Sequence, residues 1–124
     1  MKKLYVVIPC YNEEEVLFET AKRLEIKMNN MMDEDLISKD SRVVLVNDGS
    51  TDNSKQICER YCQEDSRFHL ISQTNQGQSV ARNNGVAAST GEFITFVDSD
   101  DVVSTKYLEN LYAYMTEKID LVEC

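Results

Sequence analysis

Short continuous apolar runs, separated by longer mixed segments, dominate the hydrophobic pattern of this chain. Residues 4–8 (LYVVI) are apolar throughout, as is typical of a parallel strand buried on both faces of a sheet. The β-branched runs at 42–46 and 92–97 each end where turn residues begin. The pattern predicts strands near residues 4–9, 43–48, 68–72, 93–97 and 120–123.

Segments with helical periodicity lie between these runs. Ile57 and Tyr61 share one helix face, and Leu108, Leu111 and Met115 form one stripe of another helix. An alternation of strands and helices predicts an α/β domain, with a mostly parallel sheet flanked by helices. The predicted helices lie near residues 13–29, 53–64, 78–89 and 105–118.

The helical pattern stops between Met28 and Ser41. Residues 29–35 are polar and acidic around Met31 and Met32. This composition predicts a loop or a frayed helix end. The two methionines are expected to contribute to packing rather than to contact a cofactor.

Bulk composition limits the class of protein. A chain of 124 residues, 42% hydrophobic and 28% charged, predicts a single globular domain over residues 1–124. The formal net charge of −9 disfavours nucleic acid as a partner, because binding to phosphates needs a basic surface. No apolar stretch reaches the roughly 18 residues of a membrane span, and the first apolar run is too short for a secretion signal. The sequence therefore predicts a cytoplasmic chain.

Cysteine and histidine chemistry is not favoured. The four cysteines form no CxxC pair, and we expect ordinary reduced thiols. Because His69 is the only histidine, a zinc site and a Ser/His/Asp triad are both disfavoured.

Acidic and polar residues follow three of the predicted strands. Asp98 and Asp100 end the strand near 93–97, and carboxylate oxygens are the preferred ligands of Mg²⁺ and Mn²⁺. Taken alone, this segment fits equally well as a solvated turn in which Ser99, Asp100 and Asp101 cap the helix predicted near residues 105–118. Asp48 ends a second strand, and residues 9–12 (PCYN) end the first. Because parallel strands bring their carboxyl ends to one edge, the sequence predicts a ligand site at that edge.

Arg82 supplies positive charge near these acids. It follows Gly77, whose missing side chain lets the backbone approach a ligand, and its guanidinium suits phosphate. The alternative interpretation is a structural ion pair of Arg82 with Asp48 or Asp98, and the two roles are compatible.

Four segments resemble the ordered motifs of glycosyltransferase family 2. They are residues 7–14 (VIPCYNEE), 46–52 (VNDGSTD), 77–85 and 90–101, and together they extend over nearly the whole chain. Each motif alone is a weak signal, whereas four in the same order at strand ends are a strong one.

The resemblance implies the nucleotide-sugar-binding part of a GT-A fold, which is a Rossmann-like α/β architecture. It assigns Pro9, Tyr11 and Glu13 to the nucleotide pocket. It also implies that Asp48 bonds the nucleobase and that Arg82 lies beside the nucleotide and its diphosphate.

The same resemblance implies an inverting transfer from a nucleoside-diphosphate sugar, with a UDP-sugar as the expected donor. Asp98 and Asp100 match the DXD acids. Asp100 is the expected direct ligand of manganese or magnesium, and Asp98 is expected near both the ribose and the metal. The acceptor class would be a polysaccharide, glycan or lipid.

Two departures from the family pattern limit these expectations. Asn47 stands where many members have an aspartate, which we expect to be tolerated. The family's general base and acceptor-binding elements correspond to sequence beyond Cys124, so the chain resembles an N-terminal portion and no catalytic base is assigned. Whether a longer protein that contains this chain associates with the inner face of the membrane is left open by the sequence.

Two alternative functions remain open at this stage. One is a non-catalytic nucleotide-sugar-binding module. The other is a nucleotidyltransferase, which would be expected to carry a glycine-rich basic loop after the first strand, where this chain has residues 9–13 (PCYNE).

Overall fold

The computed structural model of the chain describes residues 3–91 and 93–98. Strands and helices alternate throughout this part of the chain. The helix predicted near residues 105–118, the strand predicted near 120–123 and the proposed ligand Asp100 lie outside the described residues. The elements are β1 (Leu4–Cys10), α1 (Leu17–Asp33), β2 (Arg42–Asp48), α2 (Ser54–Glu64), β3 (Phe68–Gln73), α3 (Gln78–Ala88) and β4 (Phe93–Phe96).

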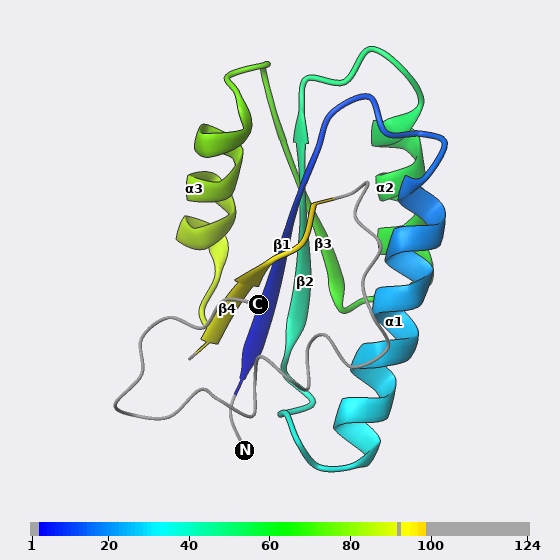
Figure 1. Cartoon of the computed structure of the whole chain (residues 1–124), viewed down its shortest axis with the longest axis vertical. Helices are drawn as coiled ribbons and strands as arrows, with labels where there is room; N and C mark the ends of the chain where they lie inside the picture. The colour runs from blue at the N-terminus through cyan, green and yellow to red at the C-terminus, as the bar shows by residue number, and fades with distance from the viewer. Residues whose placement is uncertain (1–2, 92, 99–124) are drawn as a thin grey trace.

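The four strands form one parallel sheet in the order β3-β2-β1-β4, which confirms the predicted α/β class. Helices α1 and α2 cover one face of the sheet, and α3 covers the other (Figure 1). Successive side chains along a strand point to opposite faces of the sheet. Val6 and Leu45 belong to the larger apolar cluster beneath α1 and α2, whereas Val7 and Val46 pack with Ala81 of α3.

The reversal of strand order explains this division of the helices. The chain runs outward from β1 to β3 with both crossover helices on one face, and then returns through α3 to β4 on the far side of β1. Parallel crossovers are almost always right-handed, so reversing the direction places α3 on the opposite face. The topological switch point lies between β1 and β4, where α/β sheets bind ligands at the carboxyl ends of their strands.

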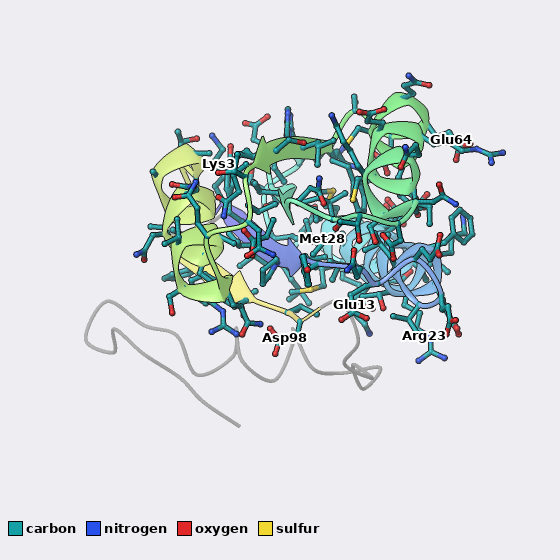
Figure 2. The ribbon with its side chains drawn as sticks, turned by 90° about the horizontal axis from the view of Figure 1, so that it is seen from above. Lys3, Glu13, Arg23, Met28, Glu64 and Asp98 are labelled. Atoms are coloured by element: carbon teal, nitrogen blue, oxygen red, sulfur yellow. The ribbon has the colours of Figure 1, made fainter. Side chains whose placement is uncertain are left out.

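The first helix begins and ends later than the sequence pattern predicts. Its predicted start near residue 13 is wrong, since α1 begins at Leu17 and the preceding residues form a turn. The prediction that helical structure ends near residue 29 is also wrong, because α1 continues to Asp33. Met28, Met31 and Met32 are all buried on one stripe of this helix, and the burial of Met31 and Met32 confirms their predicted role in packing. Figure 2 shows Met28 between α1 and the sheet.

Close packing fixes the position of α3 over β1. A β-carbon added to Gly85 would overlap the Val7 side chain and come within 3.3 Å of Val46 Cγ2. The absence of a side chain at Gly85 therefore lets α3 lie close against the sheet. None of the helices within the described residues is long and apolar enough to span a membrane.

Candidate functional site

A cavity of about 430 Å³ opens at the carboxyl-end edge of the sheet. Five residues that the sequence assigned to a nucleotide or metal site line it: Pro9, Tyr11, Glu13, Asp48 and Asp98. Figure 2 looks down on this edge of the sheet and shows Glu13 and Asp98 near each other there. Strand ends far apart in the sequence thus converge as predicted. The cavity is also lined by Cys10, Asn75, Gly77 and Gln78.

The turn after β1 is held by the turn after β2. Asn12 adopts a left-handed conformation, with φ of 51°, which asparagine tolerates better than most residues. Its backbone N–H donates to Ser50 Oγ at 3.1 Å, and its Oδ1 accepts from the Thr51 N–H at 2.8 Å. The Glu13 N–H donates to Ser54 Oγ at 2.9 Å. These bonds fix the backbone of the turn that contains the cavity residues Tyr11 and Glu13.

Acidic side chains complete the connection between the two turns. The Glu14 N–H donates to Asp52 Oδ2 at 3.2 Å, and Glu14 Oε2 accepts from the Asn53 N–H at 3.1 Å. Burial acts to raise the pKa of Asp52, but hydrogen bonds from Ser54 and the Glu14 backbone outweigh it and lower that pKa. Glu14 and Asp52 thus support the site without lining it.

Asp48 is buried and uses both carboxylate oxygens to hold the loop between β3 and α3. Its Oδ1 accepts from Gln73 Nε2 at 2.9 Å and from the Gln76 N–H at 2.8 Å. Its Oδ2 accepts from the Gly77 N–H at 3.1 Å. A buried carboxylate needs such donors to offset its lost hydration. The predicted contact of Asp48 with a nucleobase stays a prediction.

The same loop lies directly against Gly49. Gly49 has a φ of 69°, and a β-carbon there would lie 2.6 Å from the Asn75 backbone nitrogen. Both the backbone conformation and the space therefore require glycine. This close approach, together with the Asp48 hydrogen bonds, places Asn75 at the cavity rim.

Asp98 is contacted by two side chains from one face of α3. Its Oδ1 accepts from Gln78 Nε2 at 3.0 Å and from Arg82 Nη2 at 2.9 Å. The ion pair considered from the sequence therefore forms between Arg82 and Asp98. The Arg82 guanidinium also lies 5.9 Å from the centre of the Phe96 ring. Arg82 thus contacts the site through Asp98, and its predicted contact with a diphosphate stays a prediction.

The available oxygen donors suit a hard divalent cation. Within the described residues, the hydrogen bonds to Asp98 reach Oδ1 alone, which leaves Oδ2 as a possible ligand. No three Asp, Glu, His or Cys side chains in residues 3–91 and 93–98 come together to form a complete metal site. Asp98 therefore fits as one ligand of a site whose second predicted ligand, Asp100, is outside the described part.

Cys10 lines the cavity but does not have the properties of a nucleophile. It is buried, and its Sγ lies 3.4 Å from the Ile8 carbonyl oxygen. Two effects raise the pKa of Cys10 well above its usual value: the larger is a hydrogen bond with the Cys58 side chain, and the next is burial. Because the thiolate is the reactive form, this thiol is inert at neutral pH. The expectation of ordinary packing thiols agrees with the burial of Cys10 and Cys58.

Of the residues that the sequence assignment missed, Gln78 left the clearest signal. It precedes Arg82 by one helical turn, so both side chains lie on the same face of α3. Asn75 left no comparable signal, because its place depends on the conformation of a loop. Gly77, which was expected to let the backbone approach a ligand, has a φ of 94° and lies at the rim.

Comparison with known proteins identifies the family. The model of Glycosyl transferase family 2 matches residues 5–123, and the chain belongs to this family. Glycosyltransferase GlyG of Streptococcus pneumoniae is 38% identical over 114 residues, which cover 91% of this chain and 35% of GlyG. The chain spans about a third of the length of such relatives.

Solved structures agree with this assignment and with the GT-A fold. TarS 1–349 of Staphylococcus aureus, in complex with UDP, is 32% identical with a TM-score of 0.72, and the match covers 90% of this chain and 31% of the TarS 1–349 chain. A mannosyltransferase of Pyrobaculum calidifontis, PcManGT, has a TM-score of 0.72 over 94% of this chain and 33% of its own. At 22% identity, the second likeness shows the fold alone.

Proposed function

We propose that this chain forms the donor-binding domain, residues 1–124, of an inverting glycosyltransferase that uses a UDP-sugar. The observation that carries the proposal is the cavity at the switch point between β1 and β4, lined by acids and by Tyr11. The similarity to TarS, whose structure contains UDP, supports uridine as the nucleoside. The proposal concerns a nucleotide-sugar donor and leaves the acceptor, a polysaccharide, glycan or lipid, open.

The nucleoside would occupy the part of the cavity near Tyr11. Tyr11 is 45% exposed at the rim, so its ring is available to stack on a base. Pro9 lies near the end of β1 and Glu13 on the connection that follows, and cross-turn bonds to Ser54 and its neighbours keep that connection in place. Asp48 would contribute directly to the base contact or through the loop that it holds.

The diphosphate would lie toward Asp98. Asp98 and Asp100 would hold Mn²⁺ or Mg²⁺, and the bound cation would neutralise the charge that develops on the departing diphosphate. Arg82 adds a fixed positive charge beside Asp98. None of the described residues is assigned as the base that deprotonates the acceptor hydroxyl.

Calorimetry with UDP and Mn²⁺ tests the proposal directly. We expect UDP to bind in the presence of Mn²⁺ and to bind more weakly when a chelator removes the metal. Equal affinity with and without the chelator would remove the metal from the proposal, and absence of UDP binding would overturn the whole of it.

Two matched pairs of variants locate the site. Tyr11→Ala should weaken UDP binding, whereas Phe18→Ala should not, although both aromatic side chains are exposed. Asp100→Asn should weaken metal-dependent binding far more than Asp101→Asn, because only Asp100 matches the second DXD acid. If Asp101→Asn were the more damaging change, the register of the acidic turn would be wrong by one residue.

A further inference from the structure

Gln78 contacts Asp98 from the cavity side, at the start of α3. Its Nε2 donates to Asp98 Oδ1 at 3.0 Å, and Gln78 is itself a lining residue of the cavity. Arg82, one turn further along, donates to the same oxygen at 2.9 Å but does not line the cavity. The two side chains thus hold one carboxylate oxygen between them and leave the other unengaged within the described residues.

The contact between Arg82 and Asp98 is less extensive than such a pair usually makes. Arginine commonly binds a carboxylate through two parallel N–H···O bonds, with one nitrogen on each oxygen. Here a single nitrogen, Nη2, contacts Asp98. Arg82 Nε is buried and has no hydrogen-bond partner among the described residues. An unpaired buried donor is destabilising, so a hydrogen bond from Arg82 Nε to an acceptor would be favourable.

These contacts indicate what Gln78 prevents. If the carboxylate turned so that Arg82 Nε reached Oδ2, both oxygens would be held by arginine and neither would remain for a cation. The bond from Gln78 to Oδ1 opposes this rotation. Gln78 is also neutral, so it holds the carboxylate without adding a positive charge that would repel a divalent ion.

We propose that Gln78 is a positioning residue for the cation site, which keeps Asp98 Oδ2 facing the cavity by preventing a bidentate pair between Arg82 and Asp98. The inference rests on the proposed function, because it concerns the metal of a nucleotide-sugar site. Close packing at Gly85 holds α3 near β1, so the helix presents Gln78 and Arg82 to Asp98 from a fixed support. Groups outside the first coordination sphere commonly change metal affinity in this way.

The test compares Gln78→Met with Gln76→Met in the full chain. Both changes replace an amide by an apolar group of similar length. The Gln76 side chain donates to Thr74 and not to Asp98, so it serves as the control. The backbone N–H of residue 76, which donates to Asp48, is retained in Gln76→Met. Mn²⁺ is titrated into each protein in the presence of saturating UDP, and UDP is separately titrated in the presence of a chelator. Melting temperatures report on folding.

We expect Gln78→Met to weaken Mn²⁺ binding about tenfold, the lower end of the range for groups that support a metal ligand. UDP affinity in chelator and the melting temperature should stay at the wild-type values, and Gln76→Met should match the wild type throughout. The double variant Gln78→Met/Arg82→Lys should bind Mn²⁺ more tightly than Gln78→Met alone, because lysine lacks the fork needed to hold both oxygens.

The outcomes separate this inference from the proposed function. Unchanged Mn²⁺ affinity in Gln78→Met, in a chain whose wild type binds UDP and Mn²⁺, would overturn the positioning role alone. A parallel loss of Mn²⁺ affinity, metal-free UDP affinity and melting temperature would assign Gln78 a merely structural role, and so would failure of the double variant to recover. A wild-type chain that binds no UDP would overturn both proposals.

Discussion

Two arginine–aspartate pairs lie at opposite ends of the sheet and differ in how completely their hydrogen-bonding groups are used. Arg67 precedes β3, where its Nη2 lies 2.6 Å from Asp65 Oδ2 and its Nε donates to Asp65 Oδ1 at 3.0 Å. Its Nη1 contacts Asn29 and the Met32 sulfur of α1. At the carboxyl end, Arg82 contacts a single oxygen of Asp98.

Exposure follows the same division. The side chains of Arg67 and Asp65 are 21% and 12% exposed, against 37% and 35% for Arg82 and Asp98. The same two residue types therefore form a closed pair that joins α1 to the start of β3, and an open pair that retains an oxygen for a ligand. The comparison indicates that incomplete pairing beside a cavity, rather than the presence of an ion pair, marks a candidate ligand site.

The largest expected effect is on stability at the closed pair. Arg67→Met should lower the free energy of unfolding by about 2–3 kcal/mol, because it leaves Asp65 mostly buried and without its main partner. UDP affinity should not change, since the pair lies at the end of the sheet away from the cavity. Urea denaturation and calorimetry give the two quantities. A loss of UDP affinity without a loss of stability would contradict the comparison.

The reverse result is expected at the open pair. Asp98→Asn should weaken metal-dependent UDP binding by at least about tenfold, or about 1.4 kcal/mol, because it removes a charged ligand. Unfolding should change by less than about 1 kcal/mol, since both side chains are more than a third exposed. Asp65→Asn is the matched control, with the opposite pattern. Comparable losses of stability in the two variants would show that Asp98 is chiefly structural.

The closed and open pairs also show what the sequence could predict about the fold. Strand positions followed from apolar runs because a parallel strand buried on both faces has few alternatives. The bounds of α1 did not, because the acidic residues 13–15 favour a helix start locally while bonds to the next turn hold them in another conformation. Packing of Met31 and Met32 similarly extends the helix through a polar stretch.

For the site, the sequence indicated which residues meet and could not indicate how they are oriented. Acids at strand ends converge because parallel strands share an edge, so Asp48 and Asp98 were predicted together. The Asp48 carboxylate is held by the loop after β3, which passes close to Gly49, and the Asp98 carboxylate is held by Gln78 and Arg82 of α3. Hydrogen bonds across such loops carry no periodic signal, so the sequence did not indicate Asn75, whereas the spacing of Gln78 and Arg82 on one helix face was a signal for Gln78.

The closed pair should also make the free energy of unfolding depend on pH, and this effect is smaller than the two above. Hydrogen bonding from Arg67 lowers the pKa of Asp65, so this carboxylate contributes stability above its unfolded pKa of about 3.9. That contribution is lost as the pH falls through the lower folded pKa.

The difference in unfolding free energy between the wild type and Arg67→Met should thus be constant from about pH 7 to about pH 5 and decrease below about pH 4. Asp52, whose pKa is also lowered, is present in both proteins and largely cancels from the difference. Denaturant titrations at each pH measure it. A difference that grew as the pH fell would contradict the assignment of the acid-sensitive contribution to Asp65.

The smallest effect is expected at a third ion pair, which separates contact distance from environment. Arg23 Nη2 lies 2.8 Å from Glu19 Oε1, a distance between those of the other two pairs, but the side chains are 54% and 69% exposed. Figure 2 shows Arg23 on the outer side of α1. Water and salt screen such a pair, so Arg23→Met should cost at most about 0.5 kcal/mol and leave UDP affinity unchanged. If Arg23→Met destabilised the chain as much as Arg67→Met, distance alone would account for the strength of these pairs. Exposure would then not explain why the closed pair stabilises the chain more than the open pair does.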